Sequence, residues 1–189
     1  MIIVDYSGIA LASIIINKTF DESLIRHMIL NSLRMYRTRH KKEFGELVIA
    51  VDAPNNWRRK AFPQYKASRK KDRGTSTFDW NEAFRILNMV REEIKENFPY
   101  PVIHVDGCEA DDVIGTLVKK AEEAGIDTYM VTGDKDMMQL VSDKTYMYTP
   151  GNRFKPTTIY DREKVKEKWG VGPEGIIDML ALVGDTSDN

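Results

Sequence analysis

The chain is poor in cysteine and histidine. Its 189 residues include one cysteine, Cys108, and three histidines. A single cysteine excludes an intramolecular disulfide and favours a reducing compartment. The histidines His27, His40 and His104 lack the spacing of metal ligands. We therefore expect neither a disulfide scaffold nor a cysteine–histidine metal site.

Long apolar runs are also absent. No segment approaches the length of a transmembrane helix, and no charged leader precedes an apolar stretch and a cleavage site. Lysine and arginine number 28 against 29 aspartate and glutamate, so the net charge is near zero, although the two signs are separated along the chain. We expect a soluble, cytoplasmic protein without a membrane partner, forming one domain over residues 1–189 with a sizeable core.

Buried strands alternate with amphipathic helices along the chain. The expected strands are Ile2–Asp5, Leu47–Val51, Pro101–Val105, Thr128–Thr132 and Lys144–Thr149. The expected helices run from the capping box Thr19-Phe-Asp-Glu22 to about Lys41, from Asp79 past Ile94, and over 111–123, 161–169 and 173–183. This alternation predicts an α/β fold, with a mostly parallel central sheet and helices on both faces.

Carboxylates stand where the predicted strands end. Asp5 and Asp52 close or follow the first two strands, and Asp134 lies two residues beyond Thr132. Because parallel strands present their carboxyl ends at one edge of a sheet, we expect these acids to converge. Further acids stand near the start of helix 111–123, beside Asp134 and near residue 189: Glu109, Asp111, Asp112, Asp136, Asp185 and Asp188.

Such a cluster is typical of a site for hard divalent cations. Gathered like charges raise one another's pKa values, and carboxylate oxygens suit Mg²⁺ or Mn²⁺. Two such ions serve phosphoryl transfer or phosphodiester hydrolysis. Each group alone has a structural alternative, because acids at a helix start complement its dipole and Asp136-Met-Met-Gln139 fits a capping box. If the chain is extended there, the side chains of Asp134 and Asp136 point to the same side of it.

The stretch 54–76 is strongly basic and has no clean period. Between Arg58 and Arg73 it carries eight lysines and arginines against a single acid, Asp72, with Phe62 and Tyr65 interleaved. Cations bind phosphates and aromatic rings stack on exposed bases. The alternative is a solvated basic face. Together with the acidic cluster, the stretch indicates a polyanionic substrate that the basic residues hold and the acidic cluster cuts.

These motifs resemble the 5′-nuclease superfamily, which includes flap endonucleases and the 5′→3′ exonuclease domain of bacterial DNA polymerase I. The resemblance is carried by Glu109-Ala-Asp-Asp112, Gly133-Asp-Lys-Asp-Met-Met-Gln-Leu140 and Gly184-Asp-Thr-Ser-Asp-Asn189. Trp57-Arg58, Tyr65-Lys66 and Arg69 resemble the basic helical arch of that group. The overall layout is most similar to the RNases H of T-even-type bacteriophages.

The resemblance implies a PIN-like domain with an arch over its active site. It also implies Mg²⁺-dependent hydrolysis of DNA or RNA–DNA hybrids from 5′ ends or flaps, during primer removal in DNA replication, with a single-strand-binding protein or sliding clamp as a further partner. Carried over by motif, the residues that serve two metal ions are Asp5, Asp52, Glu109, Asp111, Asp112, Asp134, Asp136, Asp185 and Asp188. Those that contact nucleic acid are Arg58, Arg59, Tyr65, Lys66, Arg69 and Lys70, with Lys66 and Arg58 as the catalytic cations.

Two other functions compete with this interpretation. The segment Gly133-Asp-Lys-Asp136 resembles the acidic loop of haloacid-dehalogenase phosphatases, but Asp5-Tyr-Ser7 lacks the Asp-x-Asp that those enzymes need. Members of the nuclease group also continue into a helix–hairpin–helix segment that grips duplex DNA, whereas this chain stops at Asn189. A truncated, catalytically weak nucleic-acid-binding module is therefore the second hypothesis.

Overall fold

A mostly parallel sheet forms the centre of the fold. The computed structural model describes residues 1–151 and 156–184, without the side chains of residues 70–72. Within these residues the sheet has six strands in the order β3-β2-β1-β4-β5-β6. They are β1 (Ile2–Asp5), β2 (Leu47–Val51), β3 (Val102–His104), β4 (Thr128–Val131), β5 (Thr145–Thr149) and β6 (Thr158–Tyr160). Only β6 runs antiparallel to its neighbour in this described sheet.

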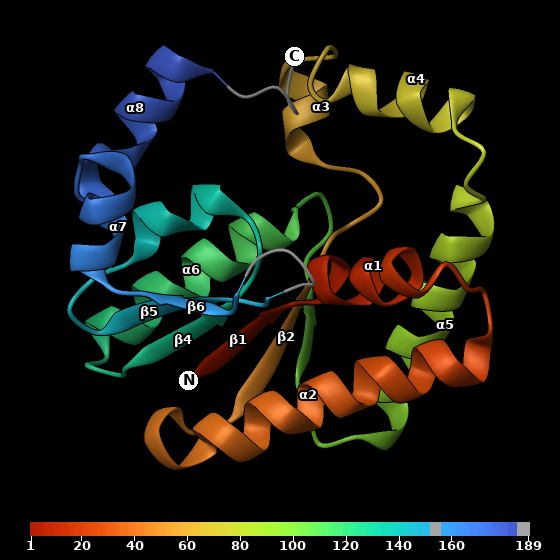
Figure 1. Ribbon diagram of the computed structural model, residues 1–189, viewed down its shortest axis with the longest axis horizontal. Coiled ribbons are helices and arrows are strands. Elements are labelled where there is room, and N and C mark those ends of the chain that lie inside the picture. The colour runs from red at the N-terminus through yellow and green to blue at the C-terminus, as the bar shows by residue number, and fades with distance from the viewer. Residues whose placement is uncertain (152–155, 185–189) are drawn as a thin grey trace.

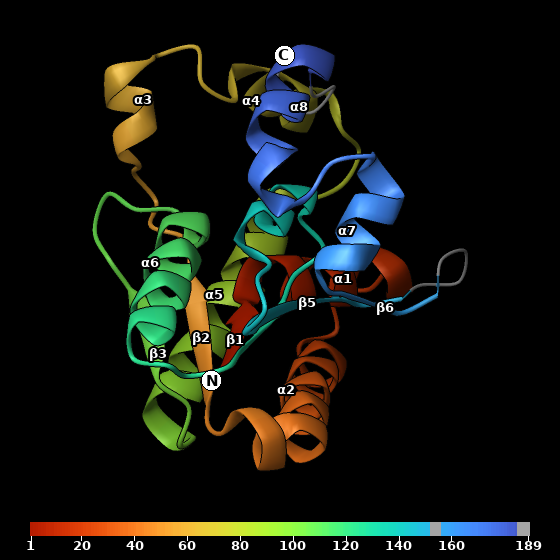
Figure 2. The same ribbon diagram turned by 90° about the vertical axis from the view of Figure 1, so that its left-hand side faces the viewer.

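Helices cover both faces of the sheet, as the alternation of elements predicted (Figures 1 and 2). Alternate strand residues face opposite sides, so Ile2 and Val4 join one core cluster and Ile3 joins the other. The first cluster is shared with α1 (Tyr6–Asn17), α2 (Glu22–Phe44) and α5 (Trp80–Asn97). The second is shared with α6 (Ala110–Glu123), η1 (Lys135–Leu140), α7 (Arg162–Trp169) and α8 (Ile176–Val183), which η2 (Pro173–Gly175) precedes.

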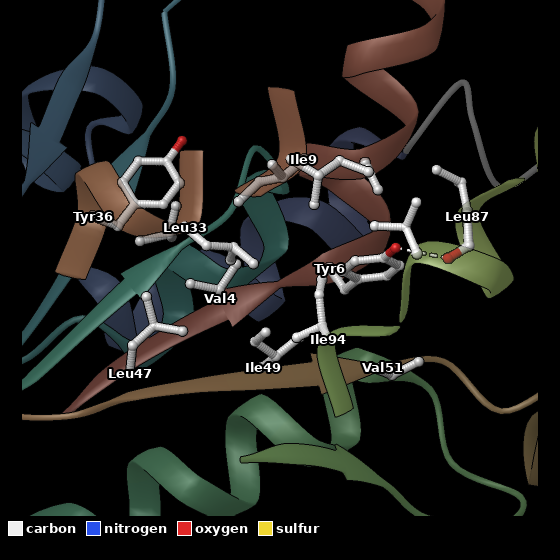
Figure 3. Packing of buried hydrophobic residues seen from close by; sticks show 14 of the residues in the cluster. Val4, Tyr6, Ile9, Leu33, Tyr36, Leu47, Ile49, Val51, Leu87 and Ile94 are labelled. Atoms are coloured by element: carbon white, nitrogen blue, oxygen red, sulfur yellow. Dashed lines mark hydrogen bonds between the residues drawn. The ribbon is translucent and has the colours of Figure 1, made fainter. Parts of the chain in front are cut away.

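The core between β1, β2 and the α1–α2–α5 layer is apolar and tightly buried. Val4, Ile49 and Leu33 are at most 1% exposed (Figure 3), and full burial of such a side chain contributes about 1.5–3 kcal/mol. The one polar group of Tyr6 is satisfied, because its hydroxyl donates to the Leu87 carbonyl at 2.7 Å (Figure 3). This packing holds the start of α1 against α5, directly beside the end of β1.

Two short helices form the basic arch. They are α3 (Trp57–Ala61) and α4 (Ala67–Thr75), and Figure 1 shows them standing apart from the sheet. The Asn56 side chain caps α3 by accepting from the Arg59 amide at 2.9 Å. Asn56 also forms a bridge with Gly107, so the foot of the arch is joined to the loop before α6. None of the described helices is long and apolar enough to cross a membrane.

The structure corrects four local predictions. Residues 6–17 form a helix and residues 158–160 a strand, neither of which was predicted. The capping box at Thr19 is wrong, because Asp21 caps α2 and accepts from the Leu24 amide at 3.0 Å. The extended chain between Asp134 and Asp136 is also wrong, since Asp134 instead caps the 3₁₀-helix η1.

Candidate active site

A cavity of about 630 Å³ lies beyond the carboxyl ends of β1 and β2. Five of the nine predicted metal-site acids line it: Asp5, Asp52, Glu109, Asp111 and Asp134. They come from β1, the residue after β2, the start of α6 and the loop after β4. The structure therefore brings acids from distant parts of the chain to one place, as the strand pattern predicted.

The strand order explains this location. The chain builds β2 and β3 on one side of β1, and then returns to place β4 on the other side. At such a reversal the connections leave in opposite directions and open a crevice at the carboxyl edge of the sheet. Asp5 ends the strand at this reversal, and Asp134 follows its new neighbour.

Hydrogen bonds fix the carboxylate of Asp5. It accepts from the Gly8 amide at 3.2 Å as the cap of α1, and from the Thr132 hydroxyl at 3.1 Å. The same hydroxyl oxygen accepts from the Asp134 amide at 3.1 Å. Thr132, which is only 1% exposed, thus links the acid of β1 to the backbone that carries the acid after β4.

Asp52 is held in the same way between two helices. Its Oδ2 accepts from the Ser7 hydroxyl at 2.6 Å, and its Oδ1 accepts from the Ala110 amide at 2.8 Å. Ser7 lies in the first turn of α1 and Ala110 is the first residue of α6. The Asp52 carboxylate therefore fixes the starts of two helices relative to the sheet.

The acids raise the cost of one another's ionisation. Burial, followed by the charges of Asp134 and Asp5, raises the pKa of Asp111 to about 7. Burial is also the largest cause for Asp5, where it and the neighbouring acids outweigh the hydrogen bonds that favour the charged form, and the pKa rises to about 6. A cation bound in this cavity at neutral pH would therefore stabilise the ionised carboxylates.

The donor set of the cavity fits hard divalent cations. Its acids offer carboxylate oxygens, which Mg²⁺ and Mn²⁺ prefer. Among the described side chains, no three histidine, cysteine or acidic groups are already arranged as a cation cage. Repulsion between ionised carboxylates opposes such close approach without an ion among them.

Two of the predicted metal-site acids do not line the cavity. Asp112 is paired with Arg58, and Asp136 belongs to the first turn of η1, where its amide donates to Asp134 Oδ1 at 2.9 Å. Asp185 and Asp188 lie outside the described residues. The Asp136 capping box is wrong as well, because the Gln139 side-chain amide donates to the Asp136 carbonyl at 2.8 Å.

The arch is tied to α6 by charged hydrogen bonds. The Arg58 guanidinium donates to both Asp112 oxygens, at 2.7 and 2.8 Å, and to Glu109 Oε2 at 3.1 Å. Tyr65 and Lys66 donate to Glu109 at 2.9 and 3.2 Å. Because the Arg58 bonds favour the carboxylate, they hold the pKa of Asp112 below its usual range. We call this five-residue group the arch latch.

Glu109 also caps α6. Its side chain and that of Asp112 form a capping box with the backbone at the helix start, and the Glu109 amide donates to Asp112 Oδ2 at 2.9 Å. These two acids therefore have a structural role at the helix start, through a capping box that was not predicted. The same pair additionally receives the cations of the arch, which a capping role does not require.

Cations of the arch line the same cavity as the acids. Arg59, Lys66, Arg69 and Arg73 line the cavity. Burial lowers the pKa of Lys66, but bonding to Tyr65 and the Glu109 charge outweigh it, so the pKa is raised and the ammonium form is favoured. The side chain of Lys70, also predicted to bind nucleic acid, lies outside the described residues.

Several residues of the site were missed from the sequence, among them Ser7, Thr132 and Arg91. Ser7 and Thr132 hold the acids, and Arg91 of α5 lines the cavity. The two hydroxyls lie two residues from Asp5 and Asp134 respectively, which was the available signal. Nothing near Arg91 in the sequence indicated its location.

Comparisons with known proteins agree with this geometry. Residues 14–170 match the family described as 5′-3′ exonuclease, N-terminal resolvase-like domain. The chain is 36% identical to DNA polymerase I of Bacillus subtilis over 144 residues, which covers 76% of this chain and 16% of the polymerase. It is 35% identical to ribonuclease H of Enterobacteria phage T4 over 146 residues, covering 73% of this chain and 48% of that protein.

Solved structures share the fold. The 5′-exonuclease of T5 with bound zinc gives a TM-score of 0.79 at 22% identity, over 100% of this chain and 68% of that one. The bacteriophage T5 flap endonuclease, in a complex with DNA and metal ions, gives 0.80 at 20% identity, over 100% of this chain and 67% of that one. The PIN-like fold with a mostly parallel sheet is thereby confirmed.

Proposed function

Because the chain belongs to the 5′-3′ exonuclease family, we propose that it is a metal-dependent 5′ nuclease. Its reaction would be hydrolysis of a phosphodiester near a 5′ end or at the base of a 5′ flap. The observation that carries the proposal is that one cavity is lined both by five carboxylates and by four cations of the arch. A polyanionic substrate together with divalent cations would satisfy both sets of charges.

Mg²⁺ is the proposed cofactor, with two ions as the working number and Mn²⁺ as a substitute. Asp5, Asp52, Glu109, Asp111 and Asp134 would hold the ions, directly or through water. The other four predicted acids, Asp112, Asp136, Asp185 and Asp188, stay predicted ligands. When bound, such ions activate water and stabilise the leaving oxygen of an in-line displacement.

The arch would position the substrate phosphate. Arg58 and Lys66 already contact carboxylates at the edge of the cavity, and a phosphate can replace a carboxylate as the acceptor of the same charged hydrogen bonds. Cations beside the reacting phosphate neutralise charge that develops in the transition state. Arg59, Tyr65, Arg69 and Lys70 would extend this contact along the strand.

The experiment is cleavage of a 5′-labelled flap DNA by the 189-residue chain. We expect cutting that requires Mg²⁺, that EDTA abolishes and that Asp134→Ala reduces by at least 1,000-fold. A matched control is Asp106→Asn, whose side chain is fully exposed outside this cavity, and it should cut like the unsubstituted chain. Tight flap binding without any cleavage in Mg²⁺ or Mn²⁺ would refute the nuclease and favour the binding module.

The same assay ranks the substrates. The cleavage rates of RNA–DNA hybrids and DNA flaps of equal sequence would be compared. If the chain removes RNA primers as well as flaps, both substrates should be cut. The cytoplasmic location, the extent of one domain over 1–189, and a single-strand-binding protein or sliding clamp as partner stay predictions. The chain spans less than half of the curated relatives described above, so its activity as a separate protein is itself part of the proposal.

A further inference from the structure

Four aromatic rings form a row from the cavity to the outer surface. We call Phe84, Trp80, Phe78 and Phe20 the aromatic row; successive ring centroids lie 6.0, 4.8 and 5.4 Å apart. Phe84 lines the acidic cavity, and Phe20, at the other end, is 36% exposed. The row runs from α5 through Phe78, in the connection between α4 and α5, to Phe20, in the connection between α1 and α2.

Positive charge accompanies the inner end of this row. The guanidinium of Arg73, on α4, lies 5.0 Å from the ring centroids of both Trp80 and Phe84. Burial, followed by the charges of Arg69 and Arg59, lowers the pKa of Arg73, so three guanidinium groups share this region. All three line the cavity with Phe84. Arginines beside aromatic faces are the combination that binds the phosphates and bases of a single strand.

A purely structural role explains only part of the row. Phe78 packs against the core cluster of α1, α2 and α5, as an aromatic side chain in a hinge between helices commonly does. That role does not account for Phe84, which lines the acidic cavity, or for Phe20, which is 36% exposed at the other end. Packing alone would gain little from a residue that is partly exposed.

We propose that the aromatic row is a stacking track for the unpaired bases on the 5′ side of the cleaved phosphodiester. The inference rests on the proposed nuclease function and identifies where its single-stranded substrate lies. Bases have a π-face whatever their sequence, so such a track would accept DNA or RNA flaps of any sequence. Arg73 would bind the backbone where the strand leaves the cavity.

The test compares binding of two flap substrates without cleavage. One carries a 5′ flap of ten thymidines, and the other carries ten abasic sites with the same phosphates. Dissociation constants are measured by fluorescence anisotropy in EDTA. A stacked base contributes about 1–3 kcal/mol, so the unsubstituted chain should bind the thymidine flap at least tenfold more tightly than the abasic flap.

The variants then locate that preference. Phe20→Ala and Phe84→Leu should each reduce the preference at least fivefold by weakening thymidine-flap binding, with abasic-flap binding unchanged, and Phe20→Tyr should retain it. The matched control is Phe98→Ala, an exposed ring that stacks on Tyr100 with centroids 6.2 Å apart after the far end of α5. Thermal unfolding checks that each variant is folded, and Phe20 is exposed enough for its substitution to be tolerated.

The possible outcomes separate this inference from the proposed function. Equal affinity of the unsubstituted chain for both flaps would overturn the track, as would equal losses in the row variants and in Phe98→Ala. Loss of binding to both flaps alike in Phe20→Ala would also overturn it. A chain that shows the predicted base preference but never cleaves in Mg²⁺ would support the track and refute the nuclease.

Discussion

Replacing Asp111 by asparagine should stabilise the metal-free protein at alkaline pH. The pKa of Asp111 is raised to about 7 by burial and by Asp134 and Asp5, against about 3.9 in an unfolded chain. The pKa of Asp111 is higher in the folded chain than in the unfolded chain. The contribution of Asp111 to the free energy of unfolding is therefore fully present below about pH 4 and is lost as the pH rises through 7. Asparagine keeps the shape of the neutral acid and does not ionise.

The size of the effect follows from that shift. Three pKa units correspond to about 4 kcal/mol, and partial solvent screening of a side chain that is not fully buried reduces this to about 2 kcal/mol. For a chain of this length, 1 kcal/mol moves the melting temperature by about 2–4 °C. We therefore expect Asp111→Asn to melt about 4–8 °C above the unsubstituted chain at pH 8 in EDTA.

The assay is differential scanning fluorimetry from pH 5 to pH 8, with and without Mg²⁺. The gain should fall by more than half at pH 5, where the folded protein keeps the proton. Mg²⁺ should stabilise the unsubstituted chain by mass action and narrow the difference. Asp106→Asn, on an exposed loop, is the control and should change nothing. An Asp111→Asn variant that is no more stable at pH 8 in EDTA would refute the electrostatic reasoning.

Three further predictions test the site, the arch and the core. Thr132→Val should lower both the cleavage rate and the Mg²⁺ affinity measured by calorimetry about tenfold, since a lost buried hydrogen bond costs about 1–3 kcal/mol. Thr132→Ser should restore both values. Normal Mg²⁺ affinity in the valine variant would contradict the link between Thr132 and Asp5. Arg58→Ala should release the arch latch and speed tryptic cleavage of the arch several-fold, and an unchanged rate would show that the latch does not hold it. Leu33→Ala should lower the free energy of unfolding in urea by about 2–5 kcal/mol, whereas Leu182→Ala, at 88% exposed, should change it by less than about 0.5 kcal/mol; similar losses would contradict the assigned core.

The sheet could be predicted because its signal is local. Runs such as Leu47–Val51 are apolar throughout, as strands covered on both faces must be, and all five residues are buried. The helix α1 was missed because its local signal is misleading. Ile14, Ile15 and Ile16 favour a strand by propensity, but packing against α2 and α5 stabilises the helix. Strand β6 has three residues and, among the described strands, pairs with β5 alone, so no pattern in its own sequence could define it.

The site could be predicted as a group of acids but not as a set of contacts. Strand ends identify Asp5 and Asp52 because chain direction alone carries them to one edge. The bonds from Ser7 and Thr132 depend on how α1 and β4 lie against β1, which spacing does not encode. For the same reason the sequence could not separate Asp111, which lines the cavity, from Asp112, which is held by Arg58.

The central position of β1 has a consequence for how the protein is made. Val4 pairs with Ile49 on one side and with Val131 on the other, so the first strand synthesised needs a neighbour encoded more than a hundred residues later. At about 5–20 residues per second, a ribosome takes roughly 6–25 s to deliver it. Until then one edge of an apolar strand stays open to other chains, and Asp5 has no counterpart from β4. Translation would have to pass beyond Asp134 before the acidic cavity could exist at all.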